Sequence, residues 1–302
     1  MIAAIDVGTN SANLLVIDEH GKELTRVITS TRLGEGLHST GELSVEAMTR
    51  TIEVITAYIA TATSLGASTI HIVGTAACRR ARNATAFSEL LQAKTQLTLE
   101  VLSESDEAAL TFSGALIGLP VLDAPTLVID IGGGSTEYTV GTQSIDVFAS
   151  IPFGAVTSTE SHISSDLPRP EDLTNLIGAV SDELEDITRD HPIVATAIRT
   201  VGVAGTIVAI AAVELGLHEF DDAALHGMTL SREAVEDVFR TVATEPLALR
   251  VQNPGLGPDR ADIIVAGCCI LVATMRRLHL SEITVSTRGL LDGVAHRARL
   301  NS

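Results

Sequence analysis

Residues 127–140 read LVIDIGGGSTEYTV, and this stretch decides the fold because residues 2–17, IAAIDVGTNSANLLVI, repeat its pattern near the start of the chain. Each copy consists of an apolar strand that ends in aspartate, a turn that contains glycine, and a second strand rich in apolar residues. Strand, turn and strand at this spacing predict a β-hairpin in each half. A third strand-like run follows each hairpin, at 23–30 and 144–150.

The same order of elements continues in both halves. Each third strand is followed by a long helical stretch, a short strand that closes on a glycine loop, a helix, a late strand and a last helix. The paired ranges are 45–65 and 171–188, 69–74 and 199–205, 97–102 and 282–285, and 105–116 and 289–300. The repeated order predicts a duplicated α/β chain with a mixed sheet in each half.

Glycine and proline cluster over residues 118–125, which is typical of a domain boundary. We therefore expect domains at 1–121 and 122–302, with the last helix, 289–302, able to pack back on the first domain. Two such lobes leave a cleft between them, and we expect the hairpin turns of both to open into it. Clefts between domains are preferred places for ligands.

Composition limits the function classes. The 302 residues carry 20 Lys and Arg against 38 Asp and Glu, a net charge of −18, and no Trp, so nucleic acid is not expected as a partner. Hydrophobic residues make up 45% of the chain, which excludes a disordered protein. The longest apolar runs, 201–213 and 263–275, are shorter than the about 20 residues of a membrane span. With three cysteines and no disulfide framework, the sequence predicts a cytoplasmic protein without a membrane partner.

The turn of the second hairpin has the composition of a phosphate-binding loop. Consecutive glycines leave backbone N–H groups accessible, and hydroxyl side chains follow them. Carboxylates near such turns suit Mg²⁺, which takes oxygen ligands and keeps several waters. The alternative is a tight hairpin that needs glycine for its dihedral angles, with solvated acids. The expected phosphate-binding residues are Gly132, Gly133, Gly134, Ser135 and Thr136, and the expected metal ligands are Asp130, Glu137 and Asp6.

Three further segments could contact phosphate. The turn of the first hairpin contributes Gly8, Thr9, Asn10 and Ser11, and a glycine loop at a later helix start contributes Gly205 and Thr206. A third segment begins a helix at Gly74 and carries Arg79, Arg80 and Arg82. Helix N-termini bind anions, and arginine grips phosphate through two parallel hydrogen bonds. Because arginines on a helix usually form a solvated face, we expect Arg79 alone to enter the cleft.

The segment 103–112 places three acids at the start of a helix. A structural reading accounts for them fully, since Ser103 or Ser105 can cap the helix and acids favour its first turn. A catalytic carboxylate is the alternative, and the pattern by itself leaves both open. The nine histidines contain no close pair with zinc-ligand spacing, so no zinc site is expected.

Taken together, the motifs resemble those of the exopolyphosphatase and guanosine pentaphosphate phosphatase family, within the superfamily of actin-like, sugar-kinase and Hsp70-type ATPases. The strings run in order over nearly the whole chain: DVGTNS at 6–11, RLGEGL at 32–37, Gly74-Thr75 with Arg79 and Asn83, DEA at 106–108, VIDIGGGSTE at 128–137, Gly205-Thr206, and RADIIVAG at 260–267. The resemblance implies two ribonuclease H-like lobes, each with a mixed five-stranded sheet, and an active site in the cleft between them.

The resemblance also implies roles for individual residues. It makes Glu107 the general base for an attacking water, places the terminal phosphate on Arg79, and gives Mg²⁺ to Asp130 and Glu137 together with Asp6. One departure is that Ala109 stands where the family often has arginine. Longer members of the family also carry a C-terminal helical region beyond the segment that this sequence matches. Without that region, we expect weaker binding of long polyphosphate chains.

Four functions follow from these observations. The first is a Mg²⁺-dependent exopolyphosphatase that releases orthophosphate from short chains of inorganic polyphosphate, and the second is a phosphohydrolase acting on the 5′-phosphate of pppGpp. The third is a sugar or acid kinase on the same fold, and the fourth is a polyphosphate or alarmone sensor without turnover, for which Ala109 leaves room. Two Tyr, six Phe and no Trp offer few residues for a guanine pocket, which favours polyphosphate. The resemblance also predicts a homodimer.

Overall fold

The computed structural model describes residues 1–301, and the chain folds into two compact units. Unit 1 consists of Met1–Ile117 together with the chain from Gly289 onward, and unit 2 is Gly118–Arg288. The sequence analysis placed the boundary after residue 121 and allowed the last helix to pack back on the first domain. The two compact units divide after Ile117, and the last helix belongs to unit 1, where it packs tightly against a neighbouring helix.

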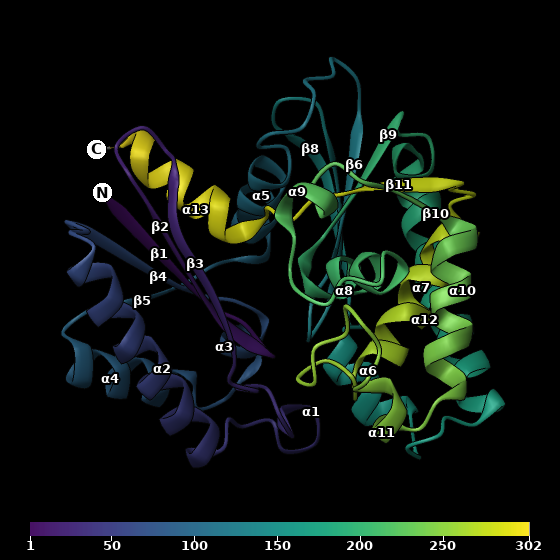
Figure 1. Cartoon of the computed structure of the whole chain (residues 1–302), viewed down its shortest axis with the longest axis horizontal. Helices are drawn as coiled ribbons and strands as arrows, with labels where there is room; N and C mark the ends of the chain where they lie inside the picture. Colours follow the sequence, from purple (N-terminus) through teal and green to yellow (C-terminus); the bar gives the residue numbers. More distant parts are fainter. Residues whose placement is uncertain (302) are drawn as a thin grey trace. The chain divides into compact units, whose positions relative to one another are not determined.

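Unit 1 is built on a five-stranded mixed sheet in the order β3-β2-β1-β4-β5 (Figure 1). The first three strands form an antiparallel meander, and β4 and β5 run parallel to β1. The strands are β1 (Ile2–Val7), β2 (Ser11–Ile17), β3 (Glu23–Ser30), β4 (Thr69–Gly74) and β5 (Leu99–Val101). The helices are α1 (Leu37–Thr40), α2 (Val45–Ser64), α3 (Ala76–Arg80), α4 (Ala84–Thr95), α5 (Glu104–Ala115) and α13 (Leu290–Leu300).

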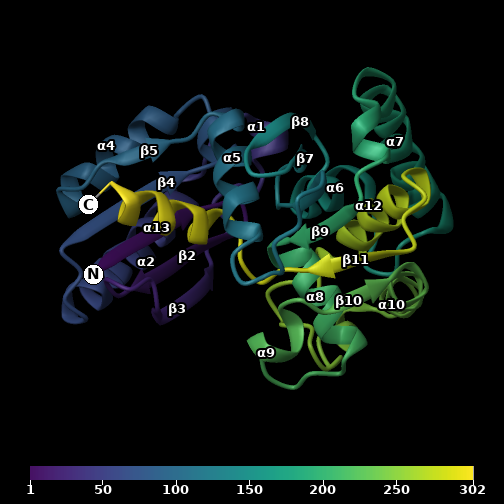
Figure 2. The same ribbon diagram turned by 90° about the horizontal axis from the view of Figure 1, so that it is seen from above.

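Both faces of this sheet are buried because its central strands are apolar on both sides. Successive side chains of a strand point to opposite faces. In β1, Ala3 and Ile5 belong to the core that packs under α2 and α4, whereas Ile2 and Ala4 belong to the core shared with α5 and α13. Figure 2 shows α13 running beside β2. The apolar run of β1 therefore positions the Asp6 turn at one end of a sheet whose central strands are covered on both faces.

Helices α5 and α13 approach each other closely because glycines line their contact. A Cβ on Gly114 of α5 would overlap the carbonyl oxygen of Gly289 and lie 2.7 Å from the amide nitrogen of Gly293. A Cβ on Gly293 would overlap the carbonyl oxygen of Leu110 in return. The two backbones thus meet without side chains between them, and this contact explains why the last helix belongs to unit 1.

Unit 2 repeats the sheet and adds one strand. Its order is β10-β11-β9-β6-β7-β8, in which β8-β7-β6-β9-β11 matches β3-β2-β1-β4-β5 of unit 1. The predicted five-stranded core is therefore present in both units, and β10 is an extra antiparallel edge strand. The strands are β6 (Thr126–Ile131), β7 (Thr136–Gly141), β8 (Ile145–Ile151), β9 (Arg199–Val203), β10 (Thr229–Ser231) and β11 (Glu282–Val285).

The helices of unit 2 enclose one large apolar core around α12, which is buried along almost its whole length. Helix α7 begins at Pro170, one residue before the predicted range of 171–188, and proline suits the first turn because its missing N–H has no partner there. Among residues 1–301 no helix combines the length and the apolar character needed to cross a membrane. The helices are α6 (Ala155–His162), α7 (Pro170–Asp190), the short 3₁₀ turn Pro192–Ala195, α8 (Ala204–Glu214), α9 (Asp222–Leu225), α10 (Arg232–Thr244), α11 (Leu247–Arg250) and α12 (Ile264–Arg277).

The glycine contact between α5 and α13 gives a stability prediction. Gly114→Ala places a methyl group against backbone atoms that cannot rotate away, so we expect the free energy of unfolding to fall by about 1–3 kcal/mol. Gly178→Ala in α7 is the matched control, because a Cβ there meets nothing within 4 Å. That variant should gain about 0.5–1 kcal/mol from reduced backbone entropy of the unfolded chain. Urea unfolding of both variants measures the difference, and equal effects would contradict the packing argument.

Candidate active site

The hairpin turns of the two units have the same geometry. In unit 1 the amide of Gly8 donates to the carbonyl oxygen of Ser11 at 2.9 Å, and in unit 2 the amide of Gly132 donates to that of Ser135 at 3.0 Å. The register places Asp6 opposite Asn13 in the first hairpin. The equivalent pair in the second hairpin is Asp130 opposite Glu137. The duplication predicted from the sequence therefore extends to single backbone hydrogen bonds and to the position of the acids.

Asp6 is a carboxyl group held in a low-dielectric environment. The side-chain amide of Asn13 donates to its Oδ2 at 2.9 Å, while Oδ1 is buried and accepts no hydrogen bond among the described residues. Burial raises the pKa of Asp6 from 3.8 to about 7; the hydrogen bond from Asn13 lowers it, and the charge of Glu107 raises it further. A buried acceptor without a partner is costly, so Oδ1 marks a place for a water, a metal ion or a ligand.

Glu107 forms an ion pair with Arg79 inside unit 1. Nη1 of Arg79 contacts Oε2 of Glu107 and also donates to the carbonyl oxygen of Leu102 at 3.2 Å. Both side chains are mostly buried, with 17% of Arg79 and 13% of Glu107 exposed. Burial raises the pKa of Glu107 above its ordinary value, although the charge of Arg79 and its hydrogen bond lower it. The result is a poorly solvated carboxylate whose proton affinity exceeds that of a surface glutamate.

The local sequence explains why Glu107 occupies this place. Ser103 caps α5 by accepting a hydrogen bond from the amide of Asp106 at 3.1 Å, which confirms one of the two predicted caps. Glu107 lies in the first turn of α5, while Arg79 lies in the last turn of α3. Asp6, Arg79 and Glu107, which are distant in sequence, are thus brought together at one end of the sheet of unit 1. Arg80, the last residue of α3, and Arg82, in the turn that follows, are both exposed.

Helix α6 holds the glycine-rich turn of unit 2 through hydrogen bonds to the carbonyl groups of the turn. The amide of Ala155 donates to the carbonyl oxygen of Gly132 at 2.9 Å, and the amides of Val156 and Thr157 donate to that of Gly133. A Cβ on Gly154 would lie 2.5 Å from the carbonyl carbon of Gly133, so only glycine allows this approach. With its carbonyl groups tied to α6, the turn is held in one conformation.

The acids beside this turn differ in environment. Asp130 and Glu137 face each other across the hairpin, and Glu137 is buried and accepts a hydrogen bond from the hydroxyl of Ser150 at 3.1 Å. Two neighbouring carboxylates form a strongly negative spot that favours a cation. Asp6 belongs to unit 1 and these two residues belong to unit 2; their joint action at one cleft stays a prediction.

One predicted phosphate contact needs correction. The hydroxyl of Thr136 is fully buried and donates to the carbonyl oxygen of Phe153 at 2.6 Å, so it stabilises the hairpin and is not directed at a ligand. Thr9 and Thr206 are buried as well, with their methyl groups against Gly34 and Gly267. A sequence shows where a hydroxyl group is, but not which neighbouring acceptor receives its hydrogen bond.

The turn of the first hairpin and the glycine loop before α8 are also constrained by their own backbone contacts and conformation. The carbonyl oxygen of Asn10 accepts hydrogen bonds from the amides of Thr31 at 3.0 Å and Arg32 at 2.8 Å, which ties the turn to the segment after β3. Gly205 lies at the start of α8, directly after Ala204, whose φ of 67° is unusual for a residue with a side chain. Such strained positions cluster at ligand-binding sites.

Arg260 is a basic residue to which the sequence analysis gave no role. Its guanidinium group covers Gly205, and any Cβ on Gly205 would overlap it. Burial lowers the pKa of Arg260, and the charge of Asp259 raises it. The RADIIVAG string contained this residue, but its position on the glycine loop depends on a contact between segments far apart in the chain. It adds a cation beside the N-terminus of α8, where anions are favoured.

The donor set fits Mg²⁺ better than a zinc-type site. Within residues 1–301, no group of three His, Cys, Asp or Glu residues could hold a metal by itself. Magnesium is usually held by one or two carboxylates, with water and substrate phosphate completing the shell. Asp6, with an unpartnered buried oxygen, and the neighbouring acids Asp130 and Glu137 are hard oxygen donors of that kind.

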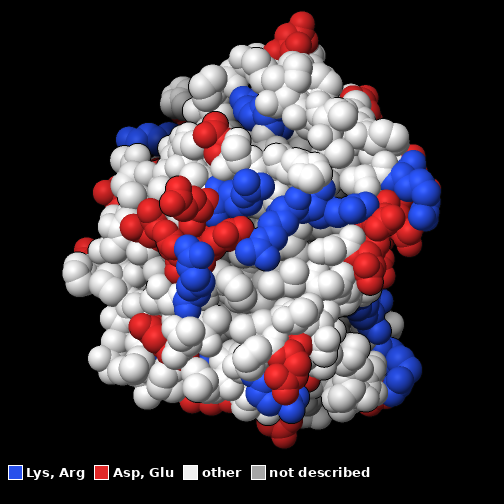
Figure 3. Space-filling model, turned by 90° about the vertical axis from the view of Figure 1, so that its right-hand side faces the viewer, with Lys and Arg blue, Asp and Glu red and all other residues white. Residues whose placement is uncertain are grey.

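Surface arginines of unit 2 do not form a second basic site. Figure 3 shows basic and acidic side chains side by side on one face of the molecule. Several helix arginines pair with a neighbouring acid: Arg240 with Asp237, Arg276 with Glu236 at 2.9 Å, Arg277 with Glu185 at 3.3 Å, and Arg189 with Asp186 at 2.6 Å. Exposed pairs of this kind contribute little and leave no net positive charge for a polyanion.

Both the sequence and the fold are similar to those of known proteins. The model of the Ppx/GppA phosphatase family matches residues 15–301. The curated protein Exopolyphosphatase 2 of Mycobacterium tuberculosis is 32% identical, covering 97% of both chains. Guanosine-5′-triphosphate,3′-diphosphate pyrophosphatase of Aeromonas salmonicida is 28% identical over 98% of this chain and 59% of its own. The crystal structure of an exopolyphosphatase-like protein has 26% identity and a TM-score of 0.93, covering 99% of both chains.

The environment of Asp6 predicts an unusual pH dependence of stability. Its pKa is higher in the folded than in the unfolded chain, so the folded state binds the proton more tightly, and stability falls as pH rises from about 4 to 7. At 1.36 kcal/mol per pKa unit the loss reaches up to about 4 kcal/mol. Asp6→Asn should therefore match the wild type near pH 4 and exceed it at pH 8, in thermal melts with chelator present.

Asp18→Asn serves as the control for that measurement. Backbone hydrogen bonds from Lys22 and His20 lower the pKa of Asp18, so this variant should lose stability above about pH 4 instead. An Asp6→Asn variant whose advantage does not grow with pH would contradict the assigned environment.

Proposed function

The chain belongs to the Ppx/GppA phosphatase family, and from this we propose that it is an exopolyphosphatase, which hydrolyses the terminal phosphoanhydride bond of inorganic polyphosphate and releases orthophosphate. The observation that carries the proposal is the buried pair of Glu107 and Arg79 beside Asp6. Hydrolysis of a phosphoanhydride requires a base for water and cations for the developing charge, and this group contains both.

In the proposed reaction Glu107 accepts a proton from the attacking water. Burial raises its pKa, which makes it a stronger base than an exposed glutamate. Arginine has five N–H donors, and Glu107 and Leu102 are contacted by Nη1 of Arg79. We assign the remaining donors of Arg79 to oxygens of the terminal phosphate. The ion pair also orients both groups before substrate arrives.

The other phosphate groups are assigned to the glycine turns. In unit 1 these are the backbone amides of the turn after Gly8, and in unit 2 those of the turn after Gly132, since the amides of Gly8 and Gly132 themselves close the turns. Gly205 and Arg260 at the start of α8 contribute further. Asp6, Asp130 and Glu137 would hold Mg²⁺, which neutralises phosphate charge when bound. A homodimer and a cytoplasmic location complete the proposal.

A second candidate substrate is pppGpp. One relative of 28% identity carries the name of a pppGpp pyrophosphatase, and the same bond type is cleaved at a nucleotide 5′-phosphate. The chain contains two Tyr, six Phe and no Trp, so few side chains are available to stack on guanine. We therefore rank polyphosphate first.

The decisive experiment compares substrates and one conservative change. Orthophosphate release is measured with Mg²⁺ from tripolyphosphate, long-chain polyphosphate and pppGpp. Glu107→Gln keeps the shape of the side chain but removes the base, so kcat should fall about 10²–10⁴-fold. Glu104→Gln, in the same helical turn but exposed, is the control and should retain most activity.

The outcomes separate the candidates. Release from the inorganic chains that Glu107→Gln abolishes supports the exopolyphosphatase, and release from pppGpp alone moves the assignment to the alarmone. Tight binding without release from any substrate would indicate a sensor and refute the mechanism. Full activity in chelator would exclude the metal.

The ion pair also predicts the pH profile. Because only ionised Glu107 can accept a proton and burial raises its pKa, kcat should fall on the acid side with a midpoint above 4.5. Arg79→Gln removes the charge and the hydrogen bond that lower this pKa, so the midpoint should move to higher pH, with a lower maximum. The measurement is kcat against pH from 4 to 9. An unchanged midpoint in Arg79→Gln would show that Glu107 is not the titrating base.

A further inference from the structure

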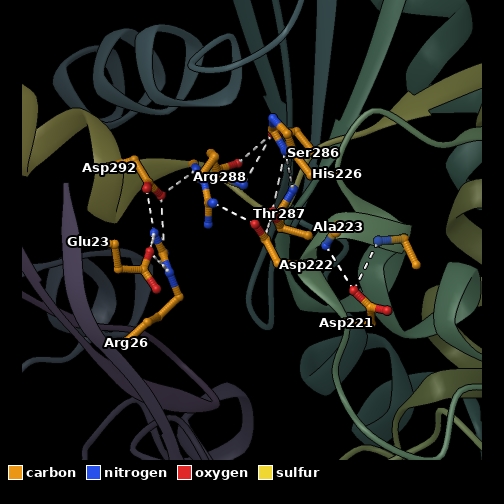
Figure 4. Close-up of polar contacts among 12 residues, drawn as sticks. Glu23, Arg26, Asp221, Asp222, Ala223, His226, Ser286, Thr287, Arg288 and Asp292 are labelled. Carbon is orange, nitrogen blue, oxygen red and sulfur yellow. Dashed lines mark hydrogen bonds and ion pairs between the residues drawn. The ribbon is translucent and has the colours of Figure 1, made fainter. Parts of the chain in front are cut away.

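A buried ion pair anchors the first turn of α13 to the edge of the sheet in unit 1. Nη1 and Nη2 of Arg26, on β3, donate to the two carboxylate oxygens of Asp292 at 3.2 and 2.5 Å (Figure 4). Side-chain exposure is 14% for Arg26 and 8% for Asp292. Asp292 also accepts a hydrogen bond from the amide of Gly289 at 3.0 Å, and Nε of Arg26 donates to Glu23 at 3.0 Å. A bidentate ion pair of this kind fixes both the distance and the relative orientation of the two side chains.

The residue after this anchor touches α5. Gly293 directly follows Asp292, and it lies so close to Leu110 of α5 that a Cβ would overlap the carbonyl oxygen of Leu110. One turn further along α5, Gly114 makes the same approach to the carbonyl oxygen of Gly289. Since backbone meets backbone at both points, a shift of the first turn of α13 cannot be absorbed by side-chain rotation and must be passed to α5.

Helix α5 carries the proposed base. Glu107 precedes Leu110 by one helical turn, and the rigid helix transmits a displacement of that turn to the carboxylate. Catalytic geometry is sensitive to such shifts, since a misplacement of about 1 Å can cost about 10²-fold in rate. The chain therefore contains a continuous path of contacts from Arg26 through Asp292, Gly293 and Leu110 to Glu107.

We propose that Arg26 and Asp292 are positioning residues for the reaction, which set the place of the Glu107 carboxylate through the contact of α13 with α5. The proposal rests on the proposed function, in which Glu107 is the base. Neither residue touches substrate in this scheme. Their effect is on the rate of the chemical step and not on phosphate binding.

The test measures kcat and KM for tripolyphosphate in Asp292→Asn and Arg26→Gln. We expect kcat to fall about 10-fold, with KM changed less than about 2-fold, because the phosphate-binding turns are untouched. Either single change already breaks the ion pair, so kcat of the double variant should equal that of either single variant and not the product of their losses. Additive losses would overturn the proposal.

Arg297→Gln is the matched control on the same helix. Arg297 pairs with Glu100 of β5 at 3.0 Å, with both side chains partly exposed, on the half of α13 that follows the glycine contact. This variant should keep the wild-type kcat. If Asp292→Asn behaves like Arg297→Gln, the anchor does not position the base. Arg26→Lys, which keeps the charge but loses the two-pronged contact, should give an intermediate kcat and replaces Asp292→Asn if that variant fails to fold.

Hydrogen exchange separates this inference from the function on which it rests. By mass spectrometry, peptides of α5 should exchange at least about 5-fold faster in Asp292→Asn than in the wild type, and no faster in Arg297→Gln. Absence of hydrolysis by the wild type refutes the proposed function, while unchanged exchange in α5 refutes the positioning. A lower kcat with unchanged exchange would assign the effect to another route and also overturn the proposal.

Discussion

Burial of charge at one end of the first sheet is the constraint on which the rest of unit 1 depends. Asp6, Arg79 and Glu107 are taken out of water together, and a carboxylate in such a place is tolerated only with a compensating cation or donor. Glu107 has Arg79, and Asp6 has Asn13 on one oxygen. The other oxygen of Asp6 has no partner among the described residues, so the cost of burial is not fully offset in the unliganded chain. This residual cost is what a ligand can relieve.

The two copies of the hairpin share one backbone geometry but carry different charges. Both turns close with the same glycine-to-serine hydrogen bond, and both begin with aspartate. The position opposite the aspartate is Asn13 in unit 1 and Glu137 in unit 2. The amide supports a single carboxyl group, whereas the second carboxylate doubles the negative charge. The backbone geometry is therefore the same in both halves, while the side chain opposite the aspartate sets how much negative charge the turn carries.

Local features of the fold could be predicted from the sequence, and contacts between distant segments could not. Strands β3, β4 and β11 have the predicted bounds because apolar runs between polar or glycine residues define them. The edge strand β10, Thr229–Ser231, was missed because three residues carry no periodicity. At the site, residue types pointed to the acids and glycines. They also pointed to the hydroxyl of Thr136, which instead donates a hydrogen bond to the carbonyl oxygen of Phe153. Such partners are decided by tertiary packing, which the sequence pattern does not contain.

The placement of arginine resolves an apparent conflict between net charge and substrate. A chain of net charge −18 repels a polyanion at long range, but ions screen this field beyond about 8 Å at physiological salt. Surface arginines such as Arg276 pair with neighbouring acids and add no attraction. Arg79 and Arg260 instead lie in poorly solvated positions, the first paired with Glu107 and the second against Gly205, where a charge interacts more strongly because water does not screen it. Under the proposed function the attraction is therefore short-ranged, and it acts on a phosphate group only at close distance.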